Sequence, residues 1–462
     1  MSSSRTARRP DLNTVYTINE DGSRNFLQVA DVRGRWQRWK KSSYWFLNLV
    51  FVALPLIEIG GKPALLFDIP GRSAHIFGGT FTNQDFHLMF FLLIGVGLGI
   101  FVLTSLAGRV WCGFVCPQTV FMEGVFRPIE RFIEGDRFQR LKRKKQGGAA
   151  NNLRKLAKHA VFLALSWAIS IWFMAYFIPY RELLGLLPHF PGHMTALLWS
   201  LFWTGMLYFD YSWFREQTCL IICPYGRLQS TLVDYDTVII GYDQGRGEPR
   251  SKGVDSGGDC IDCRRCIDVC PTGIDIRNGL QMECIGCTNC IDACDEIMEK
   301  IGKPRGLVRF DSSRGFETGT SRFFRGRFWI YAVAIVALFG LFVFRVGSRE
   351  SFHVTVTRPQ GLPFTMEEGR IRNLYTFHLQ NKTDVEKVYL IAPASDAFTG
   401  IEGVEYIIPQ PRVTLAPLDD QQVMLFASMP REGYVSGRDF VFTVTDSATS
   451  VVQDVKVRFR GP

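Results

Sequence analysis

The feature that most constrains this chain is a pair of cysteine runs within residues 260–294. They read C-I-D-C-R-R-C-I-D-V-C-P and C-I-G-C-T-N-C-I-D-A-C-D, and each has the spacing C-x2-C-x2-C-x3-C. Together they contain eight of the 12 cysteines in the chain. This spacing is typical of proteins that hold two [4Fe–4S] clusters, because two such clusters need eight thiolate ligands. We therefore predict a ferredoxin-type domain that transfers electrons.

In such runs the fourth cysteine binds the cluster of the other run. We assign Cys260, Cys263, Cys266 and Cys294 to cluster 1, and Cys270, Cys284, Cys287 and Cys290 to cluster 2. Structural zinc usually takes cysteine pairs separated by a longer finger, and disulfide frameworks are typical of small secreted chains, so both alternatives fit poorly. Pro271 follows the first run, whereas Asp295 stands at the equivalent place in the second, so the backbone of the second loop can differ.

The rest of the chain alternates between apolar and strongly basic segments. A hydrophobic content of 47% over 462 residues, with a mean hydropathy of only +0.06, indicates a membrane protein with large polar parts. Pro55 and Glu58 interrupt the first apolar segment, which makes it the weakest candidate for a membrane span. Five segments are candidates for crossing a hydrocarbon core of about 30 Å, at residues 44–59, 86–106, 159–180, 194–214 and 328–346.

The distribution of Lys and Arg predicts the orientation in the membrane. The segments up to residue 41, from 109 to 158 and from 215 to 327 are rich in cations, whereas 60–85 and 181–193 are poor in them. We therefore expect the N-terminus and the cysteine runs in the cytoplasm and the C-terminus outside. All 12 cysteines then lie on the reducing side, as iron–sulfur ligation requires. This topology explains the basic excess, so we expect no nucleic-acid partner, and the polar first 40 residues predict no secretory signal peptide.

A second cysteine set occurs as W-C-G-F-V-C-P and C-L-I-I-C-P, which contain Cys112 and Cys116, and Cys219 and Cys223. Each C-x3-C-P motif follows an apolar segment, which indicates an internal duplication. The prolines suit the first position of a helix, so Cys116 and Cys223 are expected at helix N-termini, where the macrodipole favours thiolate. Four such sulfurs could bind Cu(I), zinc or an iron–sulfur centre. Redox-active dithiols and ordinary buried cysteines are the alternatives.

Beyond the last apolar segment, short runs of alternating polar and apolar residues are separated by turn residues. This pattern predicts an immunoglobulin-like β-sandwich that lacks the usual cysteine pair, so that an apolar core replaces the disulfide. The predicted fold is a multi-domain membrane protein. Its parts are a basic tail at 1–41, a four-span region at 42–226, a ferredoxin domain at 227–327, a fifth transmembrane helix at 328–346 and a β domain at 347–462.

The order of these motifs resembles the FixG/RdxA/CcoG group of cytochrome c oxidase accessory proteins. The resemblance covers nearly the whole chain after the tail. It implies a location in a bacterial inner membrane and an immunoglobulin-like C-terminal domain. It also implies a role in assembling the cbb3-type oxidase, by reducing Cu(II) to Cu(I) for the oxidase copper centre. Because membrane ferredoxins of nitrate and nitrous oxide respiration share the C-x3-C-P motif, that motif alone leaves the substrate open.

Our leading hypothesis is a cupric reductase that takes electrons from a cytoplasmic donor and passes them to copper at Cys112, Cys116, Cys219 and Cys223. Its partners would be subunits or assembly factors of the oxidase. One alternative is an electron relay between the quinone pool and a partner reductase. Another is a non-catalytic scaffold whose outer domain binds oxidase subunits. The sequence leaves the oligomeric state open, a homodimer included.

Overall fold

The computed structural model describes residues 26–462, apart from 83–84, 188, 190–192, 251–256, 323, 360, 395–402 and 437–438. The chain folds as two compact units. The first unit extends to Ile69 and continues over Met89–Phe342, and it contains all 12 cysteines. The second unit combines Pro70–Leu88 with Val343–Pro462. Most of the predicted N-terminal tail, residues 1–25, lies outside the described residues.

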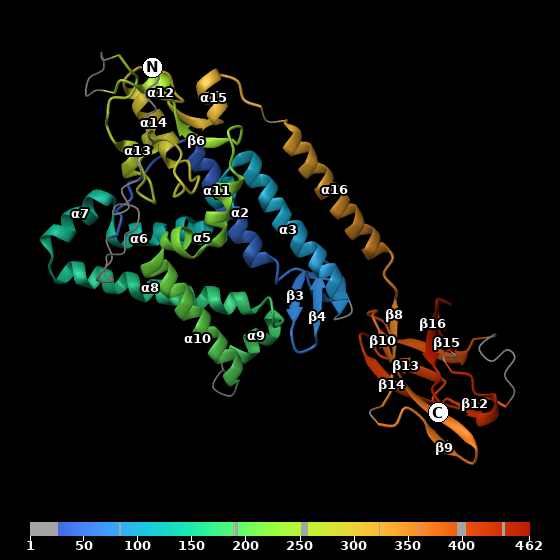
Figure 1. The fold of residues 1–462 in the computed structure, drawn as a ribbon. Coiled ribbons are helices and arrows are strands. Elements are labelled where there is room, and N and C mark those ends of the chain that lie inside the picture. The colour runs from blue at the N-terminus through green and yellow to red at the C-terminus, as the bar shows by residue number, and fades with distance from the viewer. Residues whose placement is uncertain are drawn as a thin grey trace. The chain divides into compact units, whose positions relative to one another are not determined.

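Three helices among the described residues are long and apolar enough to cross a membrane. They are α3 (Phe86–Ala107), α8 (Ala149–Met174) and α16 (Gly326–Gly347), which correspond to the second, third and fifth predicted spans (Figure 1). The third span was predicted at 159–180, so the helix begins and ends earlier than expected. In the fourth predicted span, helix α10 (Met194–Phe209) continues directly into the π-helical turn η4 (Asp210–Phe214). That segment is helical throughout, although its crossing of a membrane stays a prediction.

The first predicted span, 44–59, has the wrong bounds. Helix α2 (Arg35–Ala53) begins in the segment that we expected to be a basic tail, and it ends just before Pro55. The end has a simple cause, because proline has no N–H to continue the helical ladder and its ring clashes with the preceding turn. Residues 58–59 instead form strand β1 (Glu58–Ile59), which pairs with β2 (Lys62–Pro63). That the first predicted span crosses a membrane therefore stays a prediction.

The segments around the two C-x3-C-P motifs are short helices packed on α8 and α10. Phe126 stacks on Tyr211 with ring centroids 4.3 Å apart and meets Phe162 edge-on at 5.0 Å. The Ser170 hydroxyl donates to the Ser200 carbonyl at 2.9 Å, which joins α8 to α10. The helices of this region are α4 (Val110–Phe114), α5 (Pro117–Phe121), η2 (Met122–Phe126), α6 (Arg127–Glu134), α7 (Arg137–Gln146), α9 (Tyr180–Leu186), η5 (Thr218–Ile222) and α11 (Pro224–Leu232).

The ferredoxin segment is closed by a two-stranded antiparallel sheet, in which β6 (Ile239–Tyr242) pairs with β7 (Val308–Asp311). Ile240, Ile276, Ile291 and Met298 form the buried core beside the cysteine runs. Both runs therefore lie between two strands that hold the ends of the segment together. Its helices are α12 (Gln244–Gly247), α13 (Arg265–Asp268), η6 (Ile276–Asn278), α14 (Asn289–Lys300) and α15 (Ser313–Thr318).

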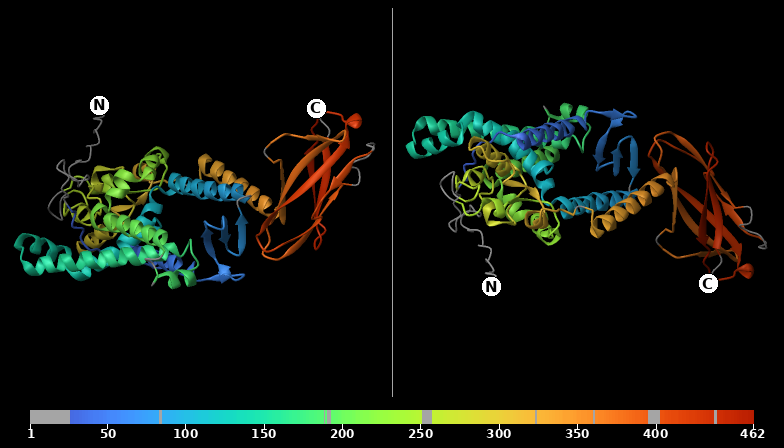
Figure 2. Two further views of the ribbon diagram at one scale, coloured as in Figure 1. Left: turned by 90° about the horizontal axis from the view of Figure 1, so that it is seen from below. Right: turned by 90° about the horizontal axis from the view of Figure 1, so that it is seen from above.

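The second unit contains the predicted immunoglobulin-like sandwich, whose two sheets face each other in Figure 2. One sheet has the order β12-β14-β10-β8, with β9 also paired to β10, and the other has the order β13-β11-β15-β16. Phe377 and Phe442 are fully buried between the sheets, with ring centroids 5.8 Å apart. The apolar core thus takes the place of a disulfide, as predicted. The strands are β8 (Phe352–Thr357), β9 (Thr365–Glu367), β10 (Arg370–Asn381), β11 (Lys387–Pro393), β12 (Glu405–Ile407), β13 (Arg412–Leu415), β14 (Asp420–Pro430), β15 (Asp439–Asp446) and β16 (Val452–Arg458).

The same unit includes the hairpin β4 (Ser73–Ile76) and β5 (Gly79–Thr82), while β3 (Leu65–Asp68) precedes it in the chain. The carboxylate of Asp85 accepts hydrogen bonds from Arg349 at 2.6 Å and from Lys382 at 3.2 Å. Asp85 is almost fully buried. Burial alone would raise its pKa, but the Thr82 backbone and the two cations outweigh burial and lower it. The start of α3 is therefore tied to the sandwich by a buried ion cluster.

Replacing Phe442 by Ala should lower the free energy of unfolding of the sandwich by about 3–5 kcal/mol, because it leaves a cavity between the sheets. The matched control is Phe426→Ala on β14, where the ring is 39% exposed, with an expected cost below about 1 kcal/mol. Hydrogen exchange of the β10 and β15 amides in the full chain measures both values. Equal costs for the two variants would contradict this account of the core.

Candidate functional site

The first predicted set of cluster ligands surrounds one cavity. Cys260 and Cys263 lie on the loop before α13, Cys266 lies in α13, and Cys294 lies in α14. All four cysteines line the same small cavity. Burial raises the pKa of Cys294, and the charges of Cys266, Cys263 and Cys260 raise it further. Four thiols that face a common space are a suitable donor set for an iron–sulfur cluster.

The second set is also brought together. Cys270 follows α13, Cys284 and Cys287 lie on the next loop, and Cys290 lies in α14. Burial raises the pKa of Cys290, and Cys287, Cys284 and Cys270 contribute to the rise. Burial likewise raises the pKa of Cys287 to about 11, with Cys270 among its neighbours. The fourth cysteine of each run thus lies with the other run, as the spacing predicts, while iron binding by each thiol stays a prediction.

Left-handed backbone turns explain how each run wraps around its cavity. The residues on either side of the second cysteine have positive φ in both runs. In the first run these are Asp262 (φ 50°) and Arg264 (φ 55°), and in the second they are Gly286 (φ 67°) and Thr288 (φ 64°). This conformation is uncommon for residues with a side chain. Its repetition at equivalent positions makes the two loops structural copies, which points their thiols inward in the same way.

The two copies differ after the fourth cysteine. Pro271 follows Cys270, and α13 has already ended at Asp268. At the equivalent place Asp295 allows α14 to continue to Lys300, because it has an N–H and no ring to clash with the preceding turn. Its carboxylate accepts a hydrogen bond from the Gly306 N–H at 2.9 Å. The departure noted in the sequence therefore lengthens a helix and leaves the thiols in place.

The C-x3-C-P motifs have the predicted backbone. Cys116 caps the N-terminus of α5 with Pro117 at the first helical position, and Cys223 caps α11 with Pro224 at the equivalent position. Cys112 and Cys219 lie one turn earlier, in α4 and in η5. Each motif follows a long apolar helix, α3 in one case and α10 with η4 in the other. The two halves therefore repeat the same arrangement, which supports the predicted duplication.

The four sulfurs of the two motifs are electrostatic neighbours. Burial raises the pKa of Cys219, followed by the charges of Cys116 and Cys112. Burial also raises the pKa of Cys112 to about 12, with Cys116 and Cys223 contributing. We expected the helix N-terminus to favour thiolate at Cys116. The Gln118 and Thr119 N–H groups do so, but burial outweighs them and raises its pKa. Among the described residues, no three His, Cys, Asp or Glu side chains lie close enough to hold one metal ion.

A backbone contact between two glycines joins the second cluster loop to the first C-x3-C-P motif. A Cβ added at Gly113 would lie 2.3 Å from the Gly286 carbonyl oxygen, and one added at Gly286 would lie 2.6 Å from the Arg109 carbonyl oxygen. Any side chain at either position would force the two loops apart. Gly113 directly follows Cys112, and Gly286 lies between Cys284 and Cys287. The two cysteine sets therefore meet at their backbones.

Helix α2 holds both loops from one side. The Lys40 ammonium donates to the Cys287 carbonyl at 3.2 Å and to the Asn289 side chain at 2.6 Å. The Tyr44 hydroxyl donates to the Gly113 carbonyl at 2.7 Å. The carboxylate of Asp292 accepts from the N–H groups of Trp36 and Gln37, at 3.2 and 2.7 Å, and so caps α2. Sequence reasoning missed these roles, because a basic segment before an apolar one reads first as a membrane anchor.

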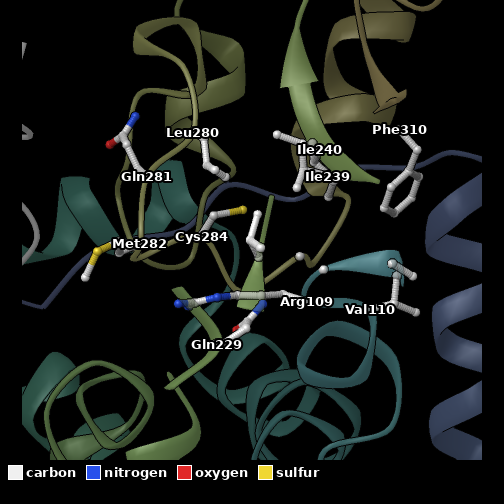
Figure 3. A pocket seen from close by; sticks show the side chains of 14 residues that line it. Arg109, Val110, Gln229, Ile239, Ile240, Leu280, Gln281, Met282, Cys284 and Phe310 are labelled. Atoms are coloured by element: carbon white, nitrogen blue, oxygen red, sulfur yellow. The ribbon is translucent and has the colours of Figure 1, made fainter. Parts of the chain in front are cut away.

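Arg109 lies between the cluster cysteines and the C-x3-C-P cysteines. It lines a cavity with Cys284, Gln229 and Phe310 (Figure 3). Its guanidinium donates to the Gly226 carbonyl at 2.8 Å, which ties the first motif to the second. Burial raises the pKa of Cys284 to about 11, and the charge of Arg109 opposes this rise. The same cation opposes the rise at Cys112. One positive charge thus stabilises thiolates of both sets.

Comparison with known proteins agrees with the division of the cysteines into a ferredoxin segment and the C-x3-C-P motifs. Residues 214–313 match a family described as "4Fe-4S dicluster domain", and 88–144 match a "4Fe-4S binding domain". Residues 342–462 match the "IG-like fold at C-terminal of FixG". RdxA of Cereibacter sphaeroides is 38% identical over 77% of this chain and 80% of its own length. FixG of Rhizobium meliloti is 30% identical over 97% and 96%. The chain belongs to the FixG/RdxA family.

RdxB of Cereibacter sphaeroides is 37% identical over 72% of this chain and 73% of its own length. A crystal structure of a FixG-related protein from Vibrio parahaemolyticus covers 24% of this chain and 96% of its own, with 19% identity and a TM-score of 0.21. The chain is therefore an iron–sulfur redox protein of the FixG/RdxA family. The match at 88–144 contains Cys112 and Cys116 and none of the ferredoxin cysteines.

A buried network of charges holds the two C-x3-C-P halves together. The Glu130 carboxylate on α6 accepts from both Nη atoms of Arg215, at 2.7 and 3.2 Å. Lys158 and Arg140 lie 3.5 and 3.6 Å from it. Arg127 on the same helix pairs with Glu216. Because Arg215 and Glu216 come just before Cys219, this network fixes the second motif against the helix that follows the first. Each charge occurs in an unremarkable helical or loop context, so the sequence did not reveal it.

Replacing Glu130 by Gln should destabilise the first unit by about 3–5 kcal/mol, because it leaves Arg215 buried without its counter-charge. Burial would raise the pKa of Glu130, but Arg215, Lys158 and Arg140 lower it from 4.5 to about 2. The native pair therefore stabilises fully above pH about 4.5 and loses its effect as the pH falls toward about 2. Thermal denaturation of the metal-free protein followed by tryptophan fluorescence measures both effects. The control, Glu296→Gln at an exposed helical pair with Lys300, should cost below about 1 kcal/mol.

Replacing Gly113 by Ala should separate the second cluster loop from the C-x3-C-P motif, since the added methyl group would overlap the Gly286 carbonyl. We expect a loss of about 1–3 kcal/mol from overpacking. The matched control is Gly99→Ala on α3, where an added Cβ meets nothing within 4 Å. Iron content and thermal stability of both variants check this. A Gly113→Ala protein as stable as the control would show that the loops do not depend on this contact.

Proposed function

We propose that this protein reduces Cu(II) to Cu(I) for the copper centre of a cbb3-type oxidase. The two crossed cysteine sets would hold two [4Fe–4S] clusters, which would supply the electrons, and the four C-x3-C-P thiols form the working site. The observation that carries the proposal is the contact of Gly113 with Gly286, which brings Cys112 beside the loop of Cys284 and Cys287. Membership of the FixG/RdxA family agrees with an iron–sulfur redox role.

The cluster ligands in this proposal are the two crossed sets. Cys260, Cys263, Cys266 and Cys294 hold cluster 1, and Cys270, Cys284, Cys287 and Cys290 hold cluster 2. When bound, each cluster carries one electron. The chain's own residues position these thiols and shield them from water. Lys40 and Arg109 lie near Cys287 and Cys284, where their positive charges favour the thiolate form that ligation requires.

The chemistry at the second cysteine set is a one-electron step. Cu(II) takes up one electron and becomes Cu(I), and the thiols lose protons as they bind the ion. Soft sulfur ligands favour the cuprous product, which gives a reason for cysteine at these four positions. The Arg109 guanidinium compensates part of the charge of the bound thiolates.

We further propose the orientation that the Lys and Arg distribution predicts. The N-terminus and the ferredoxin segment are cytoplasmic, and the sandwich is on the outer side of a bacterial inner membrane. The three apolar helices support membrane insertion. The sandwich would then bind oxidase subunits or assembly factors from outside, while electrons move on the cytoplasmic side.

The family match at 88–144 favours a second candidate, an electron relay without copper chemistry. In that case Cys112, Cys116, Cys219 and Cys223 extend the iron–sulfur chain, and the protein passes electrons to a partner reductase. The two functions differ in iron content, since two [4Fe–4S] clusters contain about eight iron atoms and a further cluster adds about four.

The double variant Cys116→Ser with Cys223→Ser separates these functions. We expect the yield of Cu(I) to fall at least about tenfold when protein reduced by dithionite, and then freed of excess dithionite, is mixed with Cu(II) under anaerobic conditions, while iron content stays near eight per chain. The control is Ile222→Val, an exposed side chain beside Cys223, which should behave as the native protein. Loss of iron in the double variant would support the relay, and an unchanged Cu(I) yield would remove these thiols from the mechanism.

A further inference from the structure

The first unit contains a large cavity that the proposed function does not use. Its volume is about 770 Å³, which lies within the usual range for small-molecule sites of about 300–1,000 Å³. It is lined by α2, by the helices that follow the first C-x3-C-P motif, and by α8. In Figure 1 these elements belong to the blue and blue-green parts of the chain. None of its lining residues is a cysteine.

One end of this cavity is apolar. Phe51 and Val52 from α2, and Leu165, Ile169 and Trp172 from α8, line that end. Leu165, Ile169 and Trp172 belong to a helix that is long and apolar enough to cross a membrane. Trp45 and Val52 line the cavity and are also exposed, by 77% and 44%. A ligand dissolved in the hydrocarbon could therefore enter here.

The other end is polar and touches the loop of cluster 2. Lys40, Glu123 and Asn289 line it. Lys40 donates to the carbonyl of Cys287, and Asn289 follows that cysteine by two positions. A polar head group in the cavity would thus lie against the loop that presents Cys287. This arrangement connects the apolar end directly to a predicted electron carrier.

The chemistry of the lining selects the class of ligand. Phe51 and Phe121 meet edge-on with ring centroids 5.3 Å apart, and such aromatic walls suit a flat ring. At the polar end an ammonium can donate to a carbonyl and a carboxylate can accept from a hydroxyl. Lys40, Lys41 and Arg131 outnumber the Glu123 carboxylate in this lining, so charge alone does not exclude a phosphate head group, and it is the aromatic walls that favour a flat ring. The combination favours a ring with oxygens at its ends and an apolar tail.

We propose that this cavity binds a membrane quinone or quinol. The inference deepens the proposed function by naming the class of its electron donor, and it puts a membrane donor in place of the cytoplasmic donor expected from the sequence. That consequence depends on the proposed clusters, whereas ligand binding itself does not. Oxidation of one quinol to a quinone releases two electrons and two protons. The two electrons match two clusters that accept one each. The two protons would leave past Lys41, which lines the polar end and is exposed to solvent.

The test is photolabelling of the full-length protein in detergent by short-chain azido-ubiquinone and azido-menaquinone probes, followed by peptide mapping. We expect label on residues 121–131 or 165–172, and we expect the parent quinones to compete for it. Label only elsewhere would overturn the proposal. Bound phospholipid in the cavity that neither quinone displaces would also overturn it. This mapping uses the native protein, so it does not depend on the folding of any variant.

A matched pair of variants gives the second measurement. Ala168 lines the cavity, whereas Ala164 lies one turn earlier on the same helix, is also exposed, and does not line it. Ala168→Trp should weaken quinone binding at least about tenfold, whereas Ala164→Trp should change it less than about twofold. The electron paramagnetic resonance spectrum after dithionite reduction should be the same in both. Equal affinity in the two variants would overturn the proposal.

These results are separable from a failure of the proposed function. Copper reduction by protein that was reduced with dithionite and then freed of excess dithionite does not need the cavity, so it tests the C-x3-C-P thiols alone. Quinone binding does not need those thiols, so Cys116→Ser with Cys223→Ser should leave photolabelling unchanged. Cluster reduction by a short-chain quinol should be lost in Ala168→Trp and kept in Ala164→Trp.

Discussion

The arrangement of the first unit depends on the close approach of Gly113 to Gly286. At both positions a single methyl group would overlap a carbonyl oxygen of the opposite loop. The contact places the loop of cluster 2 directly on a C-x3-C-P turn, so Cys112 and Cys284, which are 172 positions apart in sequence, become neighbours. Backbone contact of this kind needs support on every side, because it supplies little apolar burial of its own. Helix α2 gives that support through Lys40 and Tyr44, which bond to the carbonyls of the two loops.

A buried network of charged side chains positions the two C-x3-C-P halves relative to each other. Glu130 is surrounded by Arg215, Lys158 and Arg140, and both Glu130 and Arg215 are almost fully buried. Such a network contributes little net stability compared with an apolar core, but removal of one member leaves the others unpaired. It therefore specifies one arrangement of the two C-x3-C-P halves.

The sequence predicted those features that depend on local spacing. The cysteine runs, the prolines after Cys116 and Cys223, and the alternation in β10 and β15 each define their own geometry over a few residues. It did not predict features that depend on distant partners. Asp292 caps a helix more than 250 positions away, and nothing in its run distinguishes it from the aspartates at 262 and 268. The first span was misplaced because hydropathy averages over Pro55, whereas the backbone cannot continue a helix through it.

Under the proposed function, the two sets of cluster cysteines have different neighbours and therefore different roles. The loop of cluster 2 touches both the C-x3-C-P motif and the polar end of the large cavity. The cavity of cluster 1 is lined by the exposed Cys263 and touches neither. A quinol gives two electrons, whereas a cupric ion takes only one. Cluster 2 can therefore serve both partners, and cluster 1 can hold the second electron until another ion binds. A two-cluster domain solves this mismatch, which a single cluster beside the thiols would leave unsolved.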